Sequence, residues 1–124
     1  MPVDVLVVDD EAPITRVLSR SLLAHGYTVR VAATGEDALV SLAEARPDVM
    51  LLDINLPDLT GWEVLRRMPP DVRARVPVIV FSAAQLARHR VQEFEPAAVL
   101  LKPFPMDALL RLLGELTGTG MREA

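Results

Sequence analysis

The feature that most constrains how this chain folds is a series of five short apolar runs, separated by longer segments with helical spacing. Short runs that are apolar almost throughout are typical of parallel strands buried on both faces. The runs lie at 3–8, 27–32, 49–52, 76–81 and 98–101. We therefore expect an α/β fold, in which a five-stranded parallel sheet carries helices on both faces.

The segments between the runs predict five helices. Apolar residues recur there at intervals of three and four, Pro13 suits a first helical turn, and Thr34 suits a cap at a helix start. Val17 is placed on the inner face of the first helix, and Pro69 and Pro70 are expected to end the third. The predicted helices are 13–25, 35–46, 62–68, 83–95 and 109–116.

Composition limits the number of domains and the partners. The 124 residues, 51% of them hydrophobic, suffice for one buried core, so we expect one domain over 1–117 and a tail or linker start over 118–124. A net charge of −4 gives no general attraction to nucleic acid or to an anionic membrane, and no apolar run approaches the ~20 residues of a membrane span. The chain has no cysteine, which excludes disulfides and thiolate chemistry and fits a cytoplasmic location.

Polar side chains follow four of the five predicted strands. Asp9 and Asp10 come after the first strand, Asp53 after the third, Ser82 after the fourth and Lys102 after the fifth. In open parallel sheets ligands bind at the carboxyl ends of the strands, so these side chains are expected to meet at one edge. Their joint placement indicates a functional site.

The charges within this predicted site indicate a divalent cation. Asp9, Asp10 and Asp53 would repel one another unless a cation lay among them. All the candidate donors are oxygens, which favours Mg²⁺ over Zn²⁺, and Mn²⁺ could substitute for it. Lys102 is the only lysine beside 12 arginines, and its compact ammonium group suits an oxyanion.

Each of these residues also has a purely structural explanation. Asp9 and Asp10 could cap the following helix, Asp53 could cap a loop, Ser82 could begin a helix, and Lys102 could be a solvated side chain. We favour the functional site because several independent explanations would have to coincide at one edge of the sheet. No glycine-rich nucleotide-binding loop occurs in the sequence.

Four motifs at these strand ends resemble those of the receiver domains of two-component response regulators, in particular the single-domain chemotaxis regulators. In chain order they are VVDDE at 7–11, LLDINLPDLTG at 51–61, FSA at 81–83 and LKPF at 101–104. The resemblance covers essentially the whole chain. It implies a flavodoxin-like, doubly wound fold with the strand order 2-1-3-4-5.

The resemblance implies a role for each acidic residue. Asp53 would accept a phosphoryl group from the phosphohistidine of a sensor histidine kinase or a histidine phosphotransfer domain, or from a small donor such as acetyl phosphate. Mg²⁺ would be held by Asp10, Asp53 and the backbone carbonyl of Asn55, and by Asp9 through water. Such a domain is a signalling phosphoacceptor and not an enzyme, although it is expected to assist its own phosphorylation and dephosphorylation.

The resemblance also covers the residues that would surround the phosphoryl group. Lys102 would pair with one phosphoryl oxygen, and Ser82 would donate a hydrogen bond to another. The small side chain of Ala83 would leave room for the group, and Ala84 would affect the access of water to the acyl phosphate. The peptide bond between Lys102 and Pro103 would be cis.

Phosphorylation of such a domain is expected to draw Ser82 inward and to switch an output face. That face would comprise the helix predicted over 83–95, the strand 98–101 and the helix 109–116, and an unidentified downstream protein would bind it. The chain has Val99 where receivers commonly carry an aromatic residue, and the segment before the last strand is short, which predicts a shortened or displaced fourth helix. We expect a monomer or a phosphorylation-dependent dimer.

Two alternatives stay open. A pseudo-receiver would have the same fold but would bind its partner without phosphorylation, and the retention of all the site residues argues against it. A phosphatase of the haloacid dehalogenase type also forms an aspartyl phosphate with Mg²⁺. It requires a second aspartate two residues after the first, where this chain has Asn55.

Overall fold

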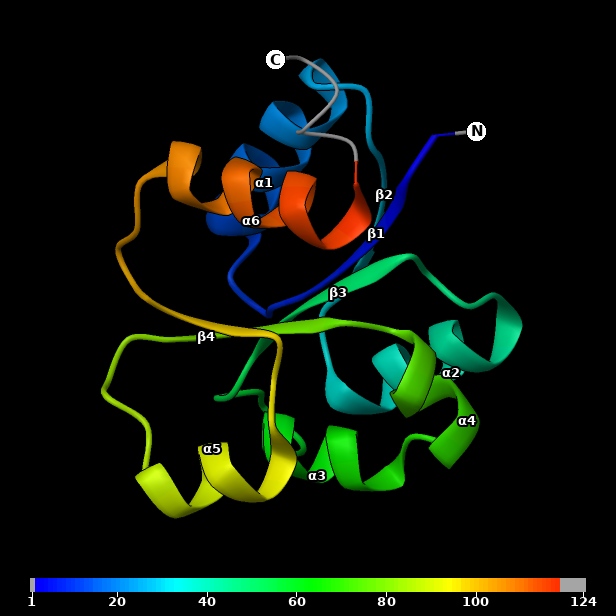
Figure 1. Cartoon of the computed structure of the whole chain (residues 1–124), viewed down its shortest axis with the longest axis vertical. Helices are drawn as coiled ribbons and strands as arrows, with labels where there is room; N and C mark the ends of the chain where they lie inside the picture. The colour runs from blue at the N-terminus through cyan, green and yellow to red at the C-terminus, as the bar shows by residue number, and fades with distance from the viewer. Residues whose placement is uncertain (1, 119–124) are drawn as a thin grey trace.

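The computed structural model describes residues 2–118 and contains the predicted five-stranded parallel sheet (Figure 1). The strand order is β2-β1-β3-β4-β5, as the resemblance implied. The strands are β1 (Asp4–Val8), β2 (Thr28–Ala32), β3 (Val49–Asp53), β4 (Val78–Ser82) and β5 (Ala98–Leu101). The bounds of each strand lie within two residues of those of an apolar run, because a strand buried on both faces needs apolar side chains in succession.

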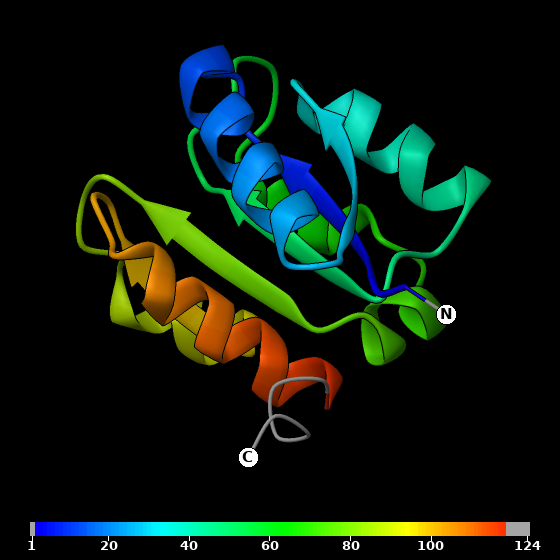
Figure 2. The ribbon, with the colours of Figure 1, turned by 90° about the horizontal axis from the view of Figure 1, so that it is seen from above.

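Helices cover both faces of this sheet. In Figure 1, α1 and α6 lie above the sheet, and α2, α3, α4 and α5 lie below it. Figure 2 looks onto the face that carries α1 and α6. The helices are α1 (Ala12–Ala24), α2 (Gly35–Glu44), α3 (Gly61–Arg67), α4 (Pro70–Arg75), α5 (Arg88–Phe94) and α6 (Met106–Thr117).

The core consists of two apolar layers, one on each side of the sheet. Leu52 and Val80 point into the layer beneath α2, α3 and α5, where Trp62 is buried with them. Leu51 and Phe81, their neighbours along the strands, point into the layer beneath α1 and α6. Burial of such side chains is the main favourable term in folding, and the two layers hold the central strands β1, β3 and β4 in place.

The start of α2 is joined to the loop that follows β3. The Thr34 hydroxyl accepts a hydrogen bond from the Asp37 N–H at 3.0 Å, as predicted for a cap. The Asp58 carboxylate accepts from the Gly35 N–H at 2.8 Å and from the Glu36 N–H at 2.9 Å. These amides belong to the first helical turn and have no acceptor within the helix, so Asp58 satisfies them and fixes its own loop.

The helix predicted over 83–95 is shorter than the sequence indicated. It begins only at Arg88, and before it the chain bends at residues 83 and 84, where the Ser82 hydroxyl accepts a hydrogen bond from the Ala84 N–H at 3.2 Å. Residue Ala87 then precedes the helix without a capping hydrogen bond. The expected start at residue 83 was therefore wrong, whereas the expectation of a shortened helix is confirmed.

Two further expectations from the sequence were wrong, the number of five helices and the placement of Val17 on the inner face of the first helix, whereas the expected end of the third helix at the two prolines is confirmed. Pro69 and Pro70 end α3, but Pro70 also begins a sixth helix, α4, because proline is compatible with the first helical position. Val17 is exposed and does not face the core. The buried residues of α1 are Thr15, Leu18 and Leu22.

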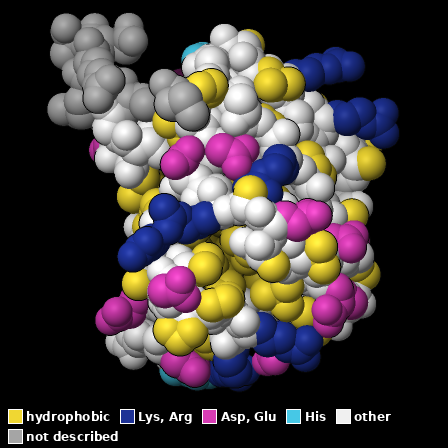
Figure 3. All heavy atoms as spheres, turned by 90° about the vertical axis from the view of Figure 1, so that its right-hand side faces the viewer, with side chains coloured by type: hydrophobic (Ala, Val, Ile, Leu, Met, Phe, Trp, Pro, Cys, Tyr) yellow, Lys and Arg dark blue, Asp and Glu magenta, His cyan; other side chains and the backbone are white. Residues whose placement is uncertain are grey.

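The surface on the side of α2 and α4 carries charges of both signs. Figure 3 shows basic and acidic side chains interspersed there with apolar ones, and neither sign forms a continuous patch. Over residues 2–118, no helix is long and apolar enough to cross a membrane.

Candidate functional site

Strand ends carry the predicted side chains to one edge of the sheet. Asp9 follows β1, Asp53 and Ser82 are the last residues of β3 and β4, and Lys102 follows β5. The register aligns β4 with β5, since Ser82 pairs with Leu101 and its carbonyl accepts a hydrogen bond from the Lys102 N–H at 2.8 Å. The sheet edge therefore brings together the side chains that the sequence predicted there.

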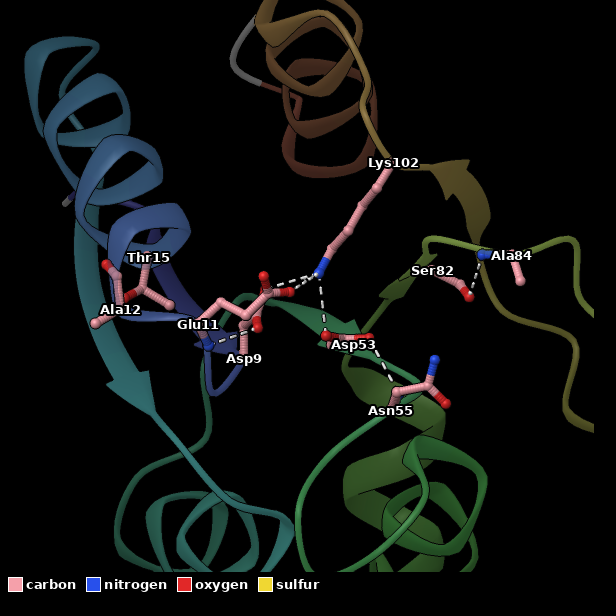
Figure 4. A network of polar contacts seen from close by, with 9 residues as sticks. All are labelled: Asp9, Glu11, Ala12, Thr15, Asp53, Asn55, Ser82, Ala84 and Lys102. Carbon is pink, nitrogen blue, oxygen red and sulfur yellow. Dashed lines mark hydrogen bonds and ion pairs between the residues drawn. The ribbon is translucent and has the colours of Figure 1, made fainter.

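The Lys102 ammonium group lies at the centre of the site (Figure 4). Its Nζ donates to Oδ2 of Asp9 and to Oδ2 of Asp53, each at 3.1 Å, and to Oε1 of Glu11 at 3.2 Å. Charge-assisted hydrogen bonds of this kind are stronger than neutral ones. The only lysine of the chain thus links the ends of β1, β3 and β5, and it is not the solvated side chain of the structural explanation.

The second oxygen of each buried carboxylate is held by the backbone. Oδ1 of Asp9 accepts from the Glu11 N–H, and Oδ1 of Asp53 accepts from the Asn55 N–H, both at 3.0 Å. Asp53 therefore does bond its own loop, as the structural explanation proposed, but only through one oxygen. Glu11 is the residue that precedes α1, and its side chain makes no capping hydrogen bond. The two carboxylates are oriented toward Lys102 from both sides.

Burial and pairing act on the pKa values of the site. Burial raises the pKa of Asp9 above its ordinary value, although the Glu11 N–H and the Lys102 ammonium oppose the rise. Burial alone would lower the pKa of Lys102, but its hydrogen bonds to Asp53 and Asp9 outweigh burial and leave the pKa raised. Lys102 is therefore protonated at neutral pH. Its single positive charge is outnumbered by the carboxylates of Asp9, Asp53 and Glu11 that it contacts.

Two aromatic rings support the lysine. The Lys102 Nζ lies 4.8 Å from the ring centroid of Phe81, close enough for a cation–π interaction. Phe104 packs edge-on against Phe81, with 6.0 Å between the ring centroids. Both phenylalanines belong to motifs quoted from the sequence, but nothing in those motifs indicated their contact with each other or with the ammonium group.

The acidic residues form a donor set that suits a hard divalent cation. Among the described residues, Asp9, Asp10 and Asp53 each offer a carboxylate oxygen, and these oxygens lie within 4.8 Å of one another. Asp9 and Asp53 are buried, whereas Asp10 is exposed, so a bound ion could keep part of its water shell. Oxygen donors, excess negative charge and a partly open position all fit Mg²⁺.

Ser82 and Ala84 lie on the other side of Asp53 from Glu11 (Figure 4). The Ser82 hydroxyl is buried and accepts from the Ala84 N–H, and it does not cap α5, which starts six residues later. Ala83 and Ala84 are exposed. The bond between Lys102 and Pro103 is cis, as the resemblance implied.

An apolar groove opens beside the site, between α1 and the loop from β5 to α6. Its volume is about 690 Å³. Glu11 and Lys102 line its end nearest the acidic residues, and the exposed Val17 lines it from α1. Val17, which was predicted to face the core, is thus part of a surface that adjoins the site.

The predicted output face has an open edge at β5. Val99 stands where an aromatic residue was expected, and both Val99 and Leu101 are exposed. The shortened α5 leaves them exposed, and its last residue, Phe94, packs against Trp62 of α3. The predicted face corresponds to α5, β5 and α6 in the structure.

Two contacts at the site were missed from the sequence. Glu11 was quoted only as the last residue of the VVDDE motif and given no role, although its place directly after two site aspartates could have indicated a contact with Lys102. Asp58 was taken only as a turn residue, and its bonds to the start of α2 had no signal in the sequence because they join segments more than 20 residues apart. Both residues contribute carboxylates to the site or to its supporting loop.

A doubly wound parallel sheet with an acidic cluster and a lysine at the carboxyl ends of its strands is the arrangement that the resemblance to receiver domains implied. Comparison with protein-family models agrees, since the response regulator receiver domain matches residues 5–113. The chain belongs to this family. It is a receiver domain of the two-component response regulators.

Individual relatives are consistent with this assignment. The chain is 43% identical over 111 residues to the transcriptional regulatory protein KdpE of Mycobacterium tuberculosis, a match that covers 88% of this chain and 48% of KdpE. The chain therefore spans about half the length of the curated relatives it matches.

Solved structures give the same fold. The chemotaxis response regulator CheY4 of Vibrio cholerae is 30% identical, with a TM-score of 0.84 and coverage of 94% of this chain and 99% of that one. The response regulator TrrA of Thermotoga maritima, solved in complex with Mg²⁺ and BeF, is 28% identical, with a TM-score of 0.79 and coverage of 92% and 98%.

Proposed function

We propose that this chain is a phosphoacceptor of a two-component phosphorelay and that Asp53 accepts the phosphoryl group. The donor is the phosphohistidine of a sensor histidine kinase or of a histidine phosphotransfer domain, or a small molecule such as acetyl phosphate. The observation that carries the proposal is the contact of Lys102 with both Asp53 and Asp9 at the end of the sheet. It places an ammonium group where the oxygens of a phosphoryl group on Asp53 would need a positive partner.

In the proposed reaction a carboxylate oxygen of Asp53 attacks phosphorus. A bond forms between that oxygen and phosphorus. With a phosphohistidine donor, the bond from phosphorus to the imidazole nitrogen breaks and its electron pair stays on the imidazole; with acetyl phosphate, the bond from phosphorus to oxygen breaks and its electron pair leaves with acetate. Lys102 exchanges one of its carboxylate contacts for a phosphoryl oxygen, and Ser82 turns from the Ala84 N–H to donate to another phosphoryl oxygen. Catalysis of this kind depends on positioning and on charge, since the side chains form no further covalent bond.

Asp9, Asp10, Asp53 and the backbone carbonyl of Asn55 are proposed to hold Mg²⁺, with Mn²⁺ as a substitute. The support is the set of three carboxylate oxygens within 4.8 Å and their excess of negative charge over Lys102. A bound divalent cation would neutralise charge on the transferred group.

The groove between α1 and the loop from β5 to α6 is proposed as the docking site of the phosphodonor protein. The donor must bring its phosphohistidine to Asp53, and the groove begins at Glu11 and Lys102, directly beside it. Its apolar lining, with the exposed Val17, provides area that a helix of the donor could bury.

The output is proposed to lie at the face formed by α5, β5 and α6, where a downstream protein would contact Val99 and Leu101. The exposure of these two side chains supports the proposal. A domain over 1–117 with a tail or linker start over 118–124 is proposed as well, and residues 119–124 lie outside the described part of the chain. Three further points stay predictions. They are a cytoplasmic location, the absence of nucleic-acid and membrane partners, and a monomer or phosphorylation-dependent dimer.

Intact mass after incubation with acetyl phosphate and Mg²⁺ tests the proposed function. The wild-type chain is expected to gain one phosphoryl group, and Asp53→Asn and a sample treated with a chelator are expected to gain none. If the wild-type chain gains none from acetyl phosphate or phosphoramidate and does not bind beryllofluoride, it acts as a pseudo-receiver, and its partner binds without phosphorylation.

A further inference from the structure

The three donors of the Lys102 ammonium group are all in use. They bind Asp9 and Asp53 at 3.1 Å and Glu11 at 3.2 Å. An ammonium group has three hydrogens and no other means of donating. A phosphoryl oxygen that contacts Lys102 must therefore displace one of the three carboxylates.

Glu11 is the carboxylate that leaves at the lowest cost. The side chains of Asp9 and Asp53 are 0% and 4% exposed, and each is also bound to a backbone N–H. The Glu11 side chain is 55% exposed and has no other hydrogen-bond or ion-pair partner within residues 2–118. A displaced Glu11 regains its hydration in water, whereas a displaced buried carboxylate would lose its partner without compensation.

Glu11 also lies where a phosphodonor enters. It lines the groove together with Lys102 and Ala83, so its negative charge stands at the rim of the site. Like charges at short range repel even in water, and a dianion is repelled more than a monoanion. Figure 4 shows the Glu11 side chain reaching Lys102 from the opposite side to Ser82 and Ala84.

We propose that Glu11 determines phosphodonor specificity by occupying Lys102 until the phosphoryl group displaces it and by repelling donors of high negative charge. The proposal rests on the proposed function of Asp53. Acetyl phosphate, a dianion at neutral pH, is disfavoured relative to phosphoramidate, whose protonated nitrogen offsets one charge. In both cases an oxygen of Asp53 bonds to phosphorus. The bond from phosphorus to the leaving group breaks, and its electron pair departs with acetate or with ammonia.

The test compares initial rates of phosphorylation, read by intact mass, for the wild-type chain, Glu11→Gln and Glu36→Gln. Glu36 is a matched control because its side chain is 61% exposed and forms one ion pair, with Arg67 at 3.1 Å. Both substitutions remove one negative charge. Each variant is incubated separately with acetyl phosphate and with phosphoramidate at one concentration of Mg²⁺, at low and at moderate salt.

Glu11→Gln is expected to raise the rate with acetyl phosphate about threefold at low salt and the rate with phosphoramidate by less. The ratio of the two rates therefore rises, and added salt reduces the rise. Glu36→Gln is expected to leave the ratio unchanged. If the ratio of the two rates is the same in Glu11→Gln as in the wild-type chain, the role of Glu11 is overturned, but the proposed function of Asp53 is not. No phosphoryl gain in the wild-type chain from either donor would overturn the proposed function and this inference with it.

Discussion

The ring of Phe94, at the end of α5, stacks on the indole of Trp62 in α3, with 5.3 Å between the ring centroids and 18° between the planes. The Arg66 guanidinium lies 5.3 Å from the centroid of the same ring, and Arg73 donates a hydrogen bond to the Phe94 carbonyl at 2.6 Å. Helix α5 is therefore attached to α3 and α4 through its last residue. Its first turn has no capping hydrogen bond.

This attachment predicts the effect of removing the Phe94 ring. Phe94→Ala is expected to lower the free energy of unfolding by about 1–2 kcal/mol, less than for a fully buried phenylalanine, because Phe94 is half-buried. Urea denaturation measures the loss. The emission of Trp62, the only tryptophan, is expected to shift to longer wavelength as water reaches the indole. Phe94→Leu keeps apolar volume and should lose less, so equal losses in the two variants would argue against the stack.

Gly61 lies against the backbone of Asp53, the proposed phosphoacceptor. A Cβ at this position would come within 2.9 Å of the Asp53 carbonyl oxygen and 2.8 Å of Ile54 Cδ1. Gly61→Ala is therefore expected to lower the free energy of unfolding by about 2 kcal/mol and to slow phosphorylation by acetyl phosphate.

Gly26→Ala is the control for this substitution. Gly26 has a φ of +88°, and a Cβ there meets no atom within 4 Å, so its substitution costs about 1 kcal/mol of backbone strain. It is expected to leave the rate of phosphorylation unchanged. Equal rates in Gly61→Ala and Gly26→Ala would show that the contact with Asp53 does not position the site.

The Asp58 carboxylate predicts a pH-dependent contribution to stability. Hydrogen bonds, first from the Glu36 N–H and then from the Gly35 and Leu59 N–H groups, hold the pKa of Asp58 below its ordinary value of 3.8. A depressed pKa means that the stabilisation is fully present above the unfolded pKa and is lost as pH falls through the folded pKa. Asp58→Asn is expected to be less stable than the wild-type chain at pH 7.

Thermal unfolding of the two chains from pH 7 down to pH 2.5 checks this sign. The difference between their melting temperatures should stay constant down to about pH 5 and shrink below pH 4. A difference that grows on acidification would contradict the role of the ionised carboxylate at the start of α2.

The acidic cluster predicts stabilisation by Mg²⁺. A ligand that binds only the folded chain raises the free energy of unfolding by about 2.7 kcal/mol at one hundred times its dissociation constant. The wild-type chain is expected to show this increase, and Asp53→Asn a smaller one at the same concentration. Asp71→Asn, which removes an exposed carboxylate of α4, should behave as the wild-type chain does. Equal increases in all three chains would place the ion elsewhere.

The architecture and the site could be predicted because local signals agree with the global fold. Asp53 and Lys102 were identified from their place directly after apolar runs, and a parallel sheet necessarily brings such positions to one edge. The motifs around them carried the family assignment. The strand order came from the resemblance, because apolar runs alone do not specify which strands are neighbours.

The remaining features depend on contacts between distant segments. The ion pair of Glu11 with Lys102 joins residues 91 positions apart, so the only local signal for it is the place of Glu11 directly after two site aspartates. A proline can end a helix or begin one, so the start of α4 at Pro70 depends on how that helix packs. An apolar residue can line a groove or a core, so the exposure of Val17 depends on how α1 packs. The stacking of Phe94 on Trp62 likewise joins two helices that are far apart in the sequence, so no local pattern indicates it.

The central claim is that Asp53 carries the phosphoryl group, and mapping the modified residue tests it most directly. The chain is phosphorylated with acetyl phosphate and Mg²⁺ and then treated with borohydride, which reduces an acyl phosphate to an alcohol. Peptide mass spectrometry is expected to find homoserine in place of Asp53 and unmodified residues at Asp9, Asp10 and Glu11. Reduction at any of those three residues, with Asp53 unchanged, would contradict the claim.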